Sequence, residues 1–237
     1  MIKVFIAGDE TIKKELAAVL QDKAEISGNL TLATDAIFEC SNMPLEKKGR
    51  NLAFFDDRCS AAIPVFTSSL CHTVSEQSKY TKYPSRLVGI GLYSTFSSAK
   101  LLEIAPSKIT DENIVQNAIS VLKDLGFETA KVPDRTGLVF PRILAMIINE
   151  ASQVYSEKIA SKEDIDTAMK LGTNYPFGPL EWADKLGIDL VYELLTALQR
   201  DFGEDRYRPH PVLKEMVNLR HLGVKAKKGF YDYTDKQ

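Results

Sequence analysis

The first stretch that could do chemistry is a glycine turn close to the N-terminus. Residues 2–8 (IKVFIAG) form a short apolar run ending at Gly8, and residues 11–20 follow with apolar side chains at helical spacing. Strand, glycine turn and helix begin a βαβ unit, which binds dinucleotide phosphates when the turn reads G-x-G-x-x-G. Here the turn reads Gly8-Asp9-Glu10-Thr11-Ile12-Lys13, so only the first glycine is present. Gly8 is therefore the one candidate cofactor-binding residue.

The other positions of this turn suit a dinucleotide badly. Glu10 stands where a second glycine would let the backbone approach a pyrophosphate, and it places a carboxylate beside the phosphates. Like charges in a partly desolvated turn are costly, and Lys13 at the third position does not restore the geometry. Glu25 lies near the spacing of the acid that binds the ribose, but the residues around it do not form a convincing second strand. The sequence therefore predicts that the adenosine half of such a site is missing.

The composition restricts the class of protein. The chain has 237 residues, enough for two modest domains, and its net charge of -2 offers no footprint for nucleic acid or an anionic membrane. The first apolar run is too short for a secretory signal, and no stretch is long enough to span a membrane. Three cysteines without a C-x-x-C pair, Cys40, Cys59 and Cys71, predict reduced, buried thiols and no metal site. We expect a soluble, cytoplasmic protein.

The first half of the chain alternates strands and helices. Short apolar runs typical of buried strands recur at 36–38, 62–66, 87–90, 101–104 and 129–132. A helix over 111–125 lies between the last two runs, with Thr110 as its predicted cap and Gly126 after its end. This alternation predicts a parallel sheet covered by helices.

The second half is predicted to be helical. A long helix is predicted over 138–155, and Ser161-x-x-Asp164 reads as a capping box for the next helix. Two more helices are predicted near 188–200 and 211–220. The fold class is therefore α/β followed by all-α, with one domain over 1–133, a second over 134–237, and the boundary near Pro133-Asp134.

A specific order of motifs fills the second half. It consists of Asp134-x-x-Gly137, Asn149-Glu150-Ala151, ASKEDIDTAMKLG over 160–172, Pro176-Phe177-Gly178-Pro179-Leu180 and Gly229-Phe230-Tyr231-Asp232-Tyr233. In this order and spacing the motifs resemble the C-terminal domain of the 3-hydroxyacyl-CoA dehydrogenases, which include the 3-hydroxybutyryl-CoA dehydrogenases. The resemblance continues into the first half, through Lys3-Val4-Phe5-Ile6-Ala7-Gly8, Thr67-Ser68-Ser69-Leu70, Arg86-Leu87-Val88-Gly89 and Lys100-Leu101-Leu102-Glu103. It implies a shortened Rossmann-like parallel sheet followed by a helical domain that makes a dimer.

The resemblance also implies a chemistry. Enzymes of this family use NAD to oxidise the 3-hydroxyl of an acyl-CoA, with a His–Glu pair that removes the proton and a Ser and an Asn that bind the oxygen. Ser68 and Glu103 stand at the family's Ser and Glu positions, whereas the His position is Gly91 and the Asn position is Pro141. Glycine cannot abstract a proton, and proline has no side-chain amide. Without an imidazole, Glu103 is predicted to be a structural acid bound to a neighbouring backbone group or cation.

The remaining candidates have ordinary structural interpretations. His72 is predicted to be solvated, and Tyr93 to be part of the core. Lys47 and Lys48 match a basic stretch that faces the cofactor in the family, but on a short helix they are predicted to form a solvated face. Asp166 is predicted to be a surface residue.

Three functional hypotheses follow. The losses favour a degenerate family member without NAD-linked dehydrogenase activity, for which no cofactor is predicted and which acts as a binding or regulatory homologue. Such a protein could hold an acyl-CoA or pair with an active homologue, and the resemblance implies a homodimer through the helical domain. The alternative is an active NAD-dependent 3-hydroxyacyl-CoA dehydrogenase with an atypical site. A different enzyme that uses Ser68, Glu103 or Tyr93 on an acyl thioester is the third, but the sequence supplies no nucleophile–base pair for it.

Overall fold

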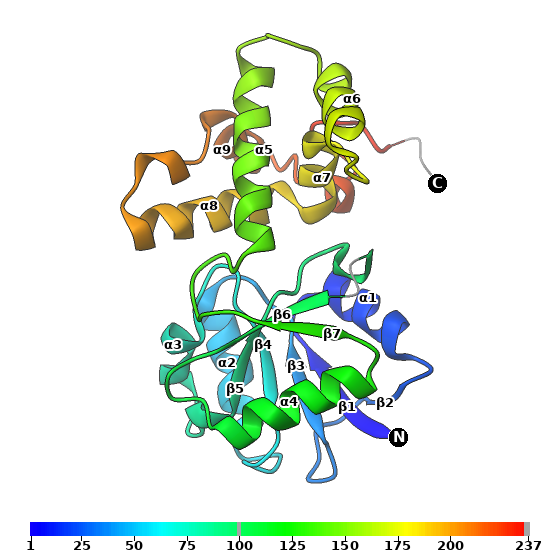
Figure 1. The fold of residues 1–237 in the computed structure, drawn as a ribbon, viewed down its shortest axis with the longest axis vertical. Coiled ribbons are helices and arrows are strands. Elements are labelled where there is room, and N and C mark those ends of the chain that lie inside the picture. Colours follow the sequence, from blue (N-terminus) through cyan, green and yellow to red (C-terminus); the bar gives the residue numbers. More distant parts are fainter. Residues whose placement is uncertain (99–100, 235–237) are drawn as a thin grey trace. The chain divides into compact units, whose positions relative to one another are not determined.

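Seven strands within the described residues, which are 1–98 and 101–234 of this computed structural model, form one sheet in the first half of the chain (Figure 1). Their order is β2-β1-β3-β4-β5-β6-β7. Every neighbouring pair is parallel except β5 and β6, which are antiparallel. The strands are β1 (Ile2–Ala7), β2 (Ala24–Ser27), β3 (Ala36–Glu39), β4 (Val65–Ser68), β5 (Leu87–Ile90), β6 (Leu101–Pro106) and β7 (Glu128–Lys131).

Helices cover both faces of this sheet, as the apolar central strands require. Every residue of β3, β4 and β5 is buried, which is the pattern of parallel strands covered on both sides. Figure 1 shows α4 in front of the sheet and α2 and α3 behind it. The helices of this unit are α1 (Glu10–Leu20), α2 (Leu45–Asp56), α3 (Val74–Gln77) and α4 (Glu112–Asp124). On the α2 side, a core forms from Ile37, Leu52, Phe55, Cys59, Val65, Val74 and Leu87.

Two predictions about the first half are wrong. A second strand does form around Glu25, because β2 pairs in parallel with β1 from Ile2↔Ala24 to Phe5↔Ser27. It is only four residues long and partly exposed, so its pattern is weak, and the described residues 28–35 return the chain to β3 without a helix. The cap of α4 is Asp111, not Thr110, because the Asp111 carboxylate accepts from Asn113 N at 2.7 Å while the Thr110 hydroxyl donates to Leu87 O at 2.9 Å.

The second half of the chain is helical, as predicted. Its helices are α5 (Phe140–Ser156), α6 (Lys162–Thr173), α7 (Pro179–Leu186), α8 (Ile188–Phe202) and α9 (Pro211–Asn218). Ser161 caps α6, because its hydroxyl accepts from Asp164 N at 3.1 Å. Asp166 is buried rather than at the surface, because its carboxylate accepts the backbone N–H groups of Leu180 and Glu181 at the start of α7.

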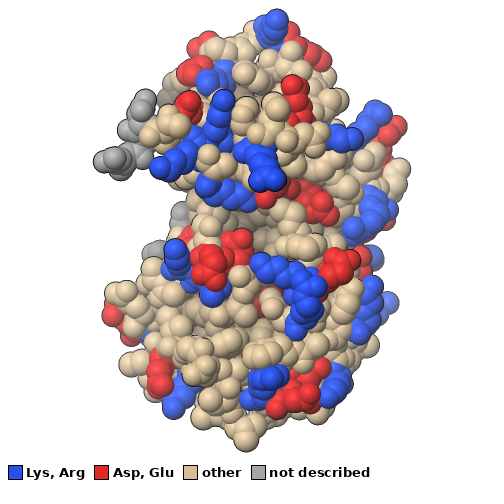
Figure 2. All heavy atoms as spheres, turned by 180° about the vertical axis from the view of Figure 1, so that it is seen from behind, with Lys and Arg blue, Asp and Glu red and all other residues tan. Residues whose placement is uncertain are grey.

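The chain divides into two compact units, Met1–Val139 and Phe140–Gln237, a few residues beyond the Pro133-Asp134 step. Cys40, Cys59 and Cys71 are free and buried, as predicted. No helix in the described part of the chain is long and apolar enough to cross a membrane. On the face that Figure 2 shows, basic and acidic side chains are found on both units.

Candidate functional site

The predicted site residues of the first unit gather at one edge of the sheet. Gly8 follows β1, Ser68 ends β4 and Gly91 follows β5, so all three lie at the carboxyl ends of parallel strands. Glu103 reaches the same place, because Gly91 N donates to Glu103 O at 3.1 Å. The strand order reverses between β1 and β3, and doubly wound sheets bind ligands outside the carboxyl ends of their strands at such a reversal. We call this region the carboxyl edge. Pro141 belongs to the other unit.

The glycine turn at this edge is filled by the protein's own groups. The Asp9 carboxylate accepts from Thr11 N at 2.9 Å and from Ile12 N at 3.2 Å, so it occupies the N–H groups that a phosphate would need. Glu10 pairs with Lys13 at 2.7 Å, and the hydrogen bond and charge of Lys13 lower the pKa of Glu10. Glu10 therefore stays ionised at neutral pH. These residues do not fit the pyrophosphate of a dinucleotide.

Gly8 has a structural reason to be glycine. Its φ is +114°, and a Cβ there would lie 2.6 Å from Ser41 N and 2.9 Å from Cys40 N. The chain that leaves β3 therefore packs directly against the turn. Gly8, the predicted cofactor-binding residue, is accounted for by this packing.

Gly8→Ala should lower the free energy of unfolding by about 3 kcal/mol, because it combines a left-handed φ with a backbone clash. Gly28→Ala is the matched control, since a Cβ there meets no atom within 4 Å; it should change stability by less than about 0.5 kcal/mol. Urea denaturation of both variants checks this. Equal stabilities would show that close packing does not explain Gly8.

Among the described residues, no acid stands at the end of β2, where a ribose-binding acid would lie. Glu25 lies inside β2 rather than at its end, and its carboxylate is 3.8 Å from Lys3 Nζ on the neighbouring strand. β2 ends at Ser27, whose hydroxyl donates to Asn29 O, and Gly28 follows. The second strand is therefore present, Glu25 faces Lys3 within the sheet, and the loss of ribose recognition stays a prediction.

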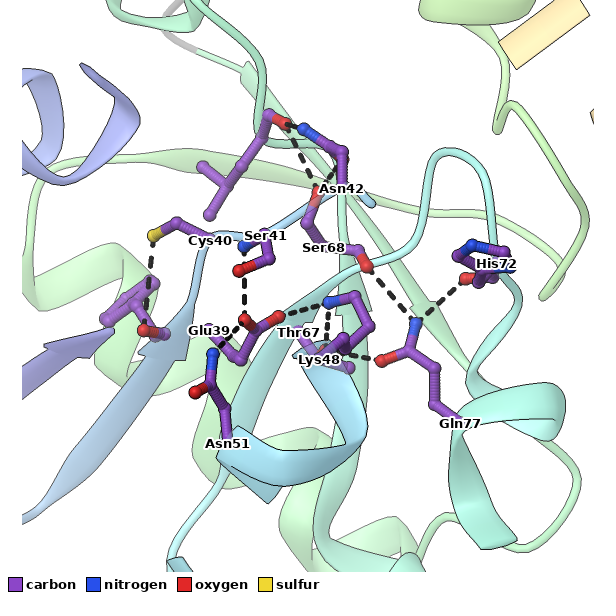
Figure 3. Close-up of polar contacts among 12 residues, drawn as sticks. Glu39, Cys40, Ser41, Asn42, Lys48, Asn51, Thr67, Ser68, His72 and Gln77 are labelled. Carbon is purple, nitrogen blue, oxygen red and sulfur yellow. Dashed lines mark hydrogen bonds and ion pairs between the residues drawn. The ribbon is translucent and has the colours of Figure 1, made fainter. Parts of the chain in front are cut away.

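A buried ion pair lies under the carboxyl ends of β3 and β4 (Figure 3). Lys48 Nζ bonds to Glu39 Oε2 and, at 2.8 Å, to Thr67 Oγ1, and neither charged side chain is exposed. The other Glu39 oxygen accepts from Asn51 Nδ2 at 2.9 Å and from Ser41 N at 3.2 Å. The prediction of a solvated Lys48 is wrong, because α2 turns this lysine inward to neutralise Glu39.

The network continues through Gln77 to the end of β4 (Figure 3). Thr67 Oγ1 donates to Gln77 Oε1 at 2.5 Å, and Gln77 Nε2 donates to Ser68 O at 3.1 Å and to His72 O at 2.8 Å. His72 is buried and not solvated, because this amide holds the turn that contains it inside the protein. The network ties β3, α2, β4 and α3 together without a ligand.

Ser68 has its hydroxyl committed to the protein. Its Oγ lies 2.6 Å from Asn42 Oδ1 and 3.2 Å from Leu92 O, and the side chain is 1% exposed. Asn42 Nδ2 in turn donates to Leu92 O at 2.9 Å. A hydroxyl held in this way has no proton left to donate to a substrate oxygen.

Glu103 and Gly91 lie side by side, and Leu138 lies close to the place where a Cβ of Gly91 would be. A Cβ at Gly91 would lie 3.9 Å from Glu103 Cβ and only 3.2 Å from Leu138 Cδ1. Leu138 is buried in a left-handed conformation, with φ +52°. Glu103 Oε2 accepts from Val139 N at 2.7 Å, a backbone bond of the kind expected of a structural acid. A side chain at position 91 therefore requires the end of the Leu138 side chain to shift by a few tenths of an ångström.

The described residues offer no clear substitute for the missing base. Tyr93 is buried in the core, and burial together with the charges of Glu103 and Glu15 raises the pKa of its hydroxyl, so it stays protonated. Burial also raises the pKa of the Cys40 thiol, which disfavours the nucleophilic thiolate. Within the described residues, no group of three His, Cys, Asp or Glu side chains could hold a metal ion.

Comparison with known proteins assigns this chain to a family. The model of the 3-hydroxyacyl-CoA dehydrogenase C-terminal domain matches residues 137–233. A 3-hydroxybutyryl-CoA dehydrogenase of Clostridioides difficile is 33% identical over 220 residues, which cover 90% of this chain and 78% of that protein. The chain belongs to the 3-hydroxyacyl-CoA dehydrogenase family. The mitochondrial hydroxyacyl-coenzyme A dehydrogenase of Sus scrofa is 29% identical over 231 residues, covering 96% of this chain and 72% of that one.

Solved structures show the same fold. The (S)-3-hydroxybutyryl-CoA dehydrogenase PaaH1 of Ralstonia eutropha matches with a TM-score of 0.82 at 24% identity, over 98% of this chain and 99% of that chain. The sheet with a helical second unit is therefore the fold of this family. The sequence had indicated that assignment, but it did not indicate Asn42 or Gln77 as partners at the carboxyl edge. One signal existed for the ion pair, since Glu39 ends an apolar strand and needs a nearby cation.

Proposed function

We propose that this member of the 3-hydroxyacyl-CoA dehydrogenase family does not carry out NAD-linked dehydrogenation and acts as a binding or regulatory homologue in acyl-CoA metabolism, in the cytoplasm. The observation that carries the proposal is Gly91, which stands at the family's His position beside Glu103 and has no imidazole, and where a Cβ would lie 3.2 Å from Leu138 Cδ1. The glycine turn supports the proposal independently. Asp9 accepts a backbone N–H that a pyrophosphate would need, and Glu10 pairs with Lys13, the cation of the turn.

The assay is the NADH-dependent reduction of acetoacetyl-CoA, followed by absorbance. Loss of a general base alone lowers rates by about 10²–10⁴-fold, so kcat/KM should fall at least about 10³-fold below that of an active relative measured in parallel. Titration with millimolar NAD in a calorimeter should give no binding heat. Turnover at the level of the relative would overturn the proposal.

A reversion variant sharpens this test. Glu10→Gly, Lys13→Gly and Gly91→His together should still give no activity, because the new imidazole meets Leu138 and Asp9 still caps α1. Adding Leu138→Ala to this variant is the matched comparison, since it removes the side-chain atom that lies 3.2 Å from a Cβ at position 91. Activity of the triple variant alone would show that these positions are sufficient.

An active dehydrogenase with an atypical site is the second candidate. The similarity to enzymes named 3-hydroxybutyryl-CoA dehydrogenase over 90% of the chain favours it. Ser68 and Glu103, which stand at the family positions, would then be the catalytic residues, and the same NADH assay decides between the two candidates.

We also propose a homodimer through the helical unit, with an acyl-CoA or an active homologue as further partners. A groove of about 930 Å³ between α5 and α6 supports the dimer. Its walls are largely apolar, and its lining carries charges of both signs, which would allow the same patch on two copies to be complementary. Its lining includes Arg142, Ile143, Met146, Ile147, Glu150, Val154, Asp164, Met169 and Arg206.

Light scattering at micromolar concentration should give the mass of a dimer. Met146→Glu, which puts a charge into the groove, should shift the mass towards that of a monomer, whereas Lys158→Glu, outside the groove lining, should not. A monodisperse monomer of the unmodified protein would contradict the dimer.

A further inference from the structure

The loop that follows β5 runs along the carboxyl edge. It begins at Gly91, and Leu92 O accepts from Asn42 Nδ2 at 2.9 Å and lies 3.2 Å from Ser68 Oγ. Asn42 follows β3 and Ser68 ends β4, so the loop lies against the ends of both strands. Its later residues contact α1, the helix that follows β1. In the sheet order, β3 and β4 lie between β1 and β5. A loop that starts at the end of β5 and bonds to α1, which follows β1, therefore passes the reversal of strand order between β1 and β3.

One carboxylate fastens the far end of this loop. Glu15, on α1, accepts from Thr95 N at 2.9 Å, from Ser97 N at 3.0 Å and from Ser97 Oγ at 2.5 Å. Phe96 lies between these two residues and is fully buried, with its ring centroid 6.5 Å from that of Phe127. The hydrogen bonds to Glu15 and the burial of the Phe96 ring therefore hold the same three residues of the loop in place.

The loop is held in a conformation that its sequence does not favour. Thr95 has a φ of +76°, and a β-branched residue in this region is strained. Hydrogen bonds to a carboxylate are among the strong ones, so Glu15 can offset this strain. A turn that is strained at Thr95 and fastened by the Glu15 carboxylate has a second state, in which Thr95 relaxes once the carboxylate is withdrawn.

We propose that residues 91–97 form a strap that closes the carboxyl edge, and that Glu15 is the latch that keeps it closed. With the latch released, Thr95 relaxes, Phe96 leaves its place beside Phe127, and the ends of β3 and β4 with Asn42 and Ser68 become accessible. The strap concerns access to the edge and goes beyond the proposed loss of dehydrogenase chemistry. A protein that turned over substrate could have the same latch.

Hydrogen exchange followed by mass spectrometry tests the latch on the full chain. Glu15→Gln keeps the size of the side chain but removes its charge, and peptides covering 92–97 should exchange at least about tenfold faster than in the unmodified protein. Glu10→Gln is the matched control, because Glu10 is an exposed acid on the same helix that bonds to Lys13, and it should leave these peptides unchanged. Peptides from α4 should be unaffected in both variants.

Two results would overturn the proposal. One is exchange of 92–97 in Glu15→Gln within about twofold of the unmodified protein. The other is an equal acceleration in Glu10→Gln. If Glu15→Gln fails to fold, Glu15→Asp carries the test under the same criterion, since its shorter side chain keeps the charge but reaches the loop less well. The NADH assay is independent of all these readouts, so failure of the strap and failure of the proposed function can be told apart.

Discussion

Lys48→Met should lower the free energy of unfolding by about 3 to 5 kcal/mol, because it leaves the buried Glu39 carboxylate without its cation. Both side chains are completely buried, so water cannot replace the lost partner. Thr67 loses the lysine as a donor in the same variant. Urea denaturation followed by far-ultraviolet circular dichroism measures the change.

The neighbouring residue supplies the control. Lys47→Met removes the same charge from the exposed face of α2 and should change stability by less than about 0.5 kcal/mol. Glu39→Gln combined with Lys48→Met should recover part of the loss, because no unpaired charge remains inside. A cost below about 1 kcal/mol for Lys48→Met would contradict the interpretation that this pair holds the carboxyl edge together without a ligand.

Asp184→Ala should destabilise the second unit by about 3 kcal/mol, because three donors lose their acceptor. The buried Asp184 carboxylate accepts from Phe230 N at 2.9 Å, from Tyr231 N at 2.8 Å and from Tyr233 Oη at 3.1 Å. It thereby fastens the segment after Gly229 to α7. Fluorescence of Trp182, the single tryptophan of the chain, reports unfolding of this unit.

The same carboxyl gives a pH dependence of known sign. Burial raises the pKa of Asp184 above its unfolded value, and hydrogen bonds from Tyr231, Phe230 and Tyr233 oppose the shift. A raised pKa means that the folded state binds the proton more tightly, so this group's contribution to stability is complete below the unfolded pKa of about 3.9 and is lost as pH rises through the folded pKa.

Asp184→Asn removes this titration and is the matched variant. The stability of the unmodified protein relative to Asp184→Asn should therefore increase as pH falls from neutral towards the unfolded pKa of about 3.9. Urea denaturation of both proteins at a series of pH values gives the difference. A relative stability that decreases over this range would mean that the pKa of Asp184 is lowered in the folded protein.

Much of the architecture could be read from the sequence. The apolar runs of β3 and β5 and the helical periodicity of α5 are local patterns, and local patterns survive in any tertiary context that buries them. β2 was missed because it is short and exposed, and pairing with β1 rather than its own pattern makes it a strand.

The sequence also predicted which groups are absent from the site, because the absence of a side chain or of a glycine depends on residue type alone. Gly91 has no side chain that could act as a base, and Glu10 puts a carboxylate where the fingerprint has a glycine. For Gly8, the sequence indicated only one of two reasons for a glycine. Its identity pointed to a cofactor turn, but its close packing against Cys40 and Ser41 could be seen only once β3 lay beside β1.

The sequence by itself determined the fold, the family and the chemical groups that are missing. Only the tertiary structure decided which side chains surround the positions of these groups. Lys48 is buried and paired with Glu39, Leu138 lies beside Gly91, and Glu15 bonds to Ser97, which lies 82 residues further along the chain. These contacts join residues distant in sequence, so no local pattern encodes them, and they form only when folding brings the strand ends to one edge of the sheet.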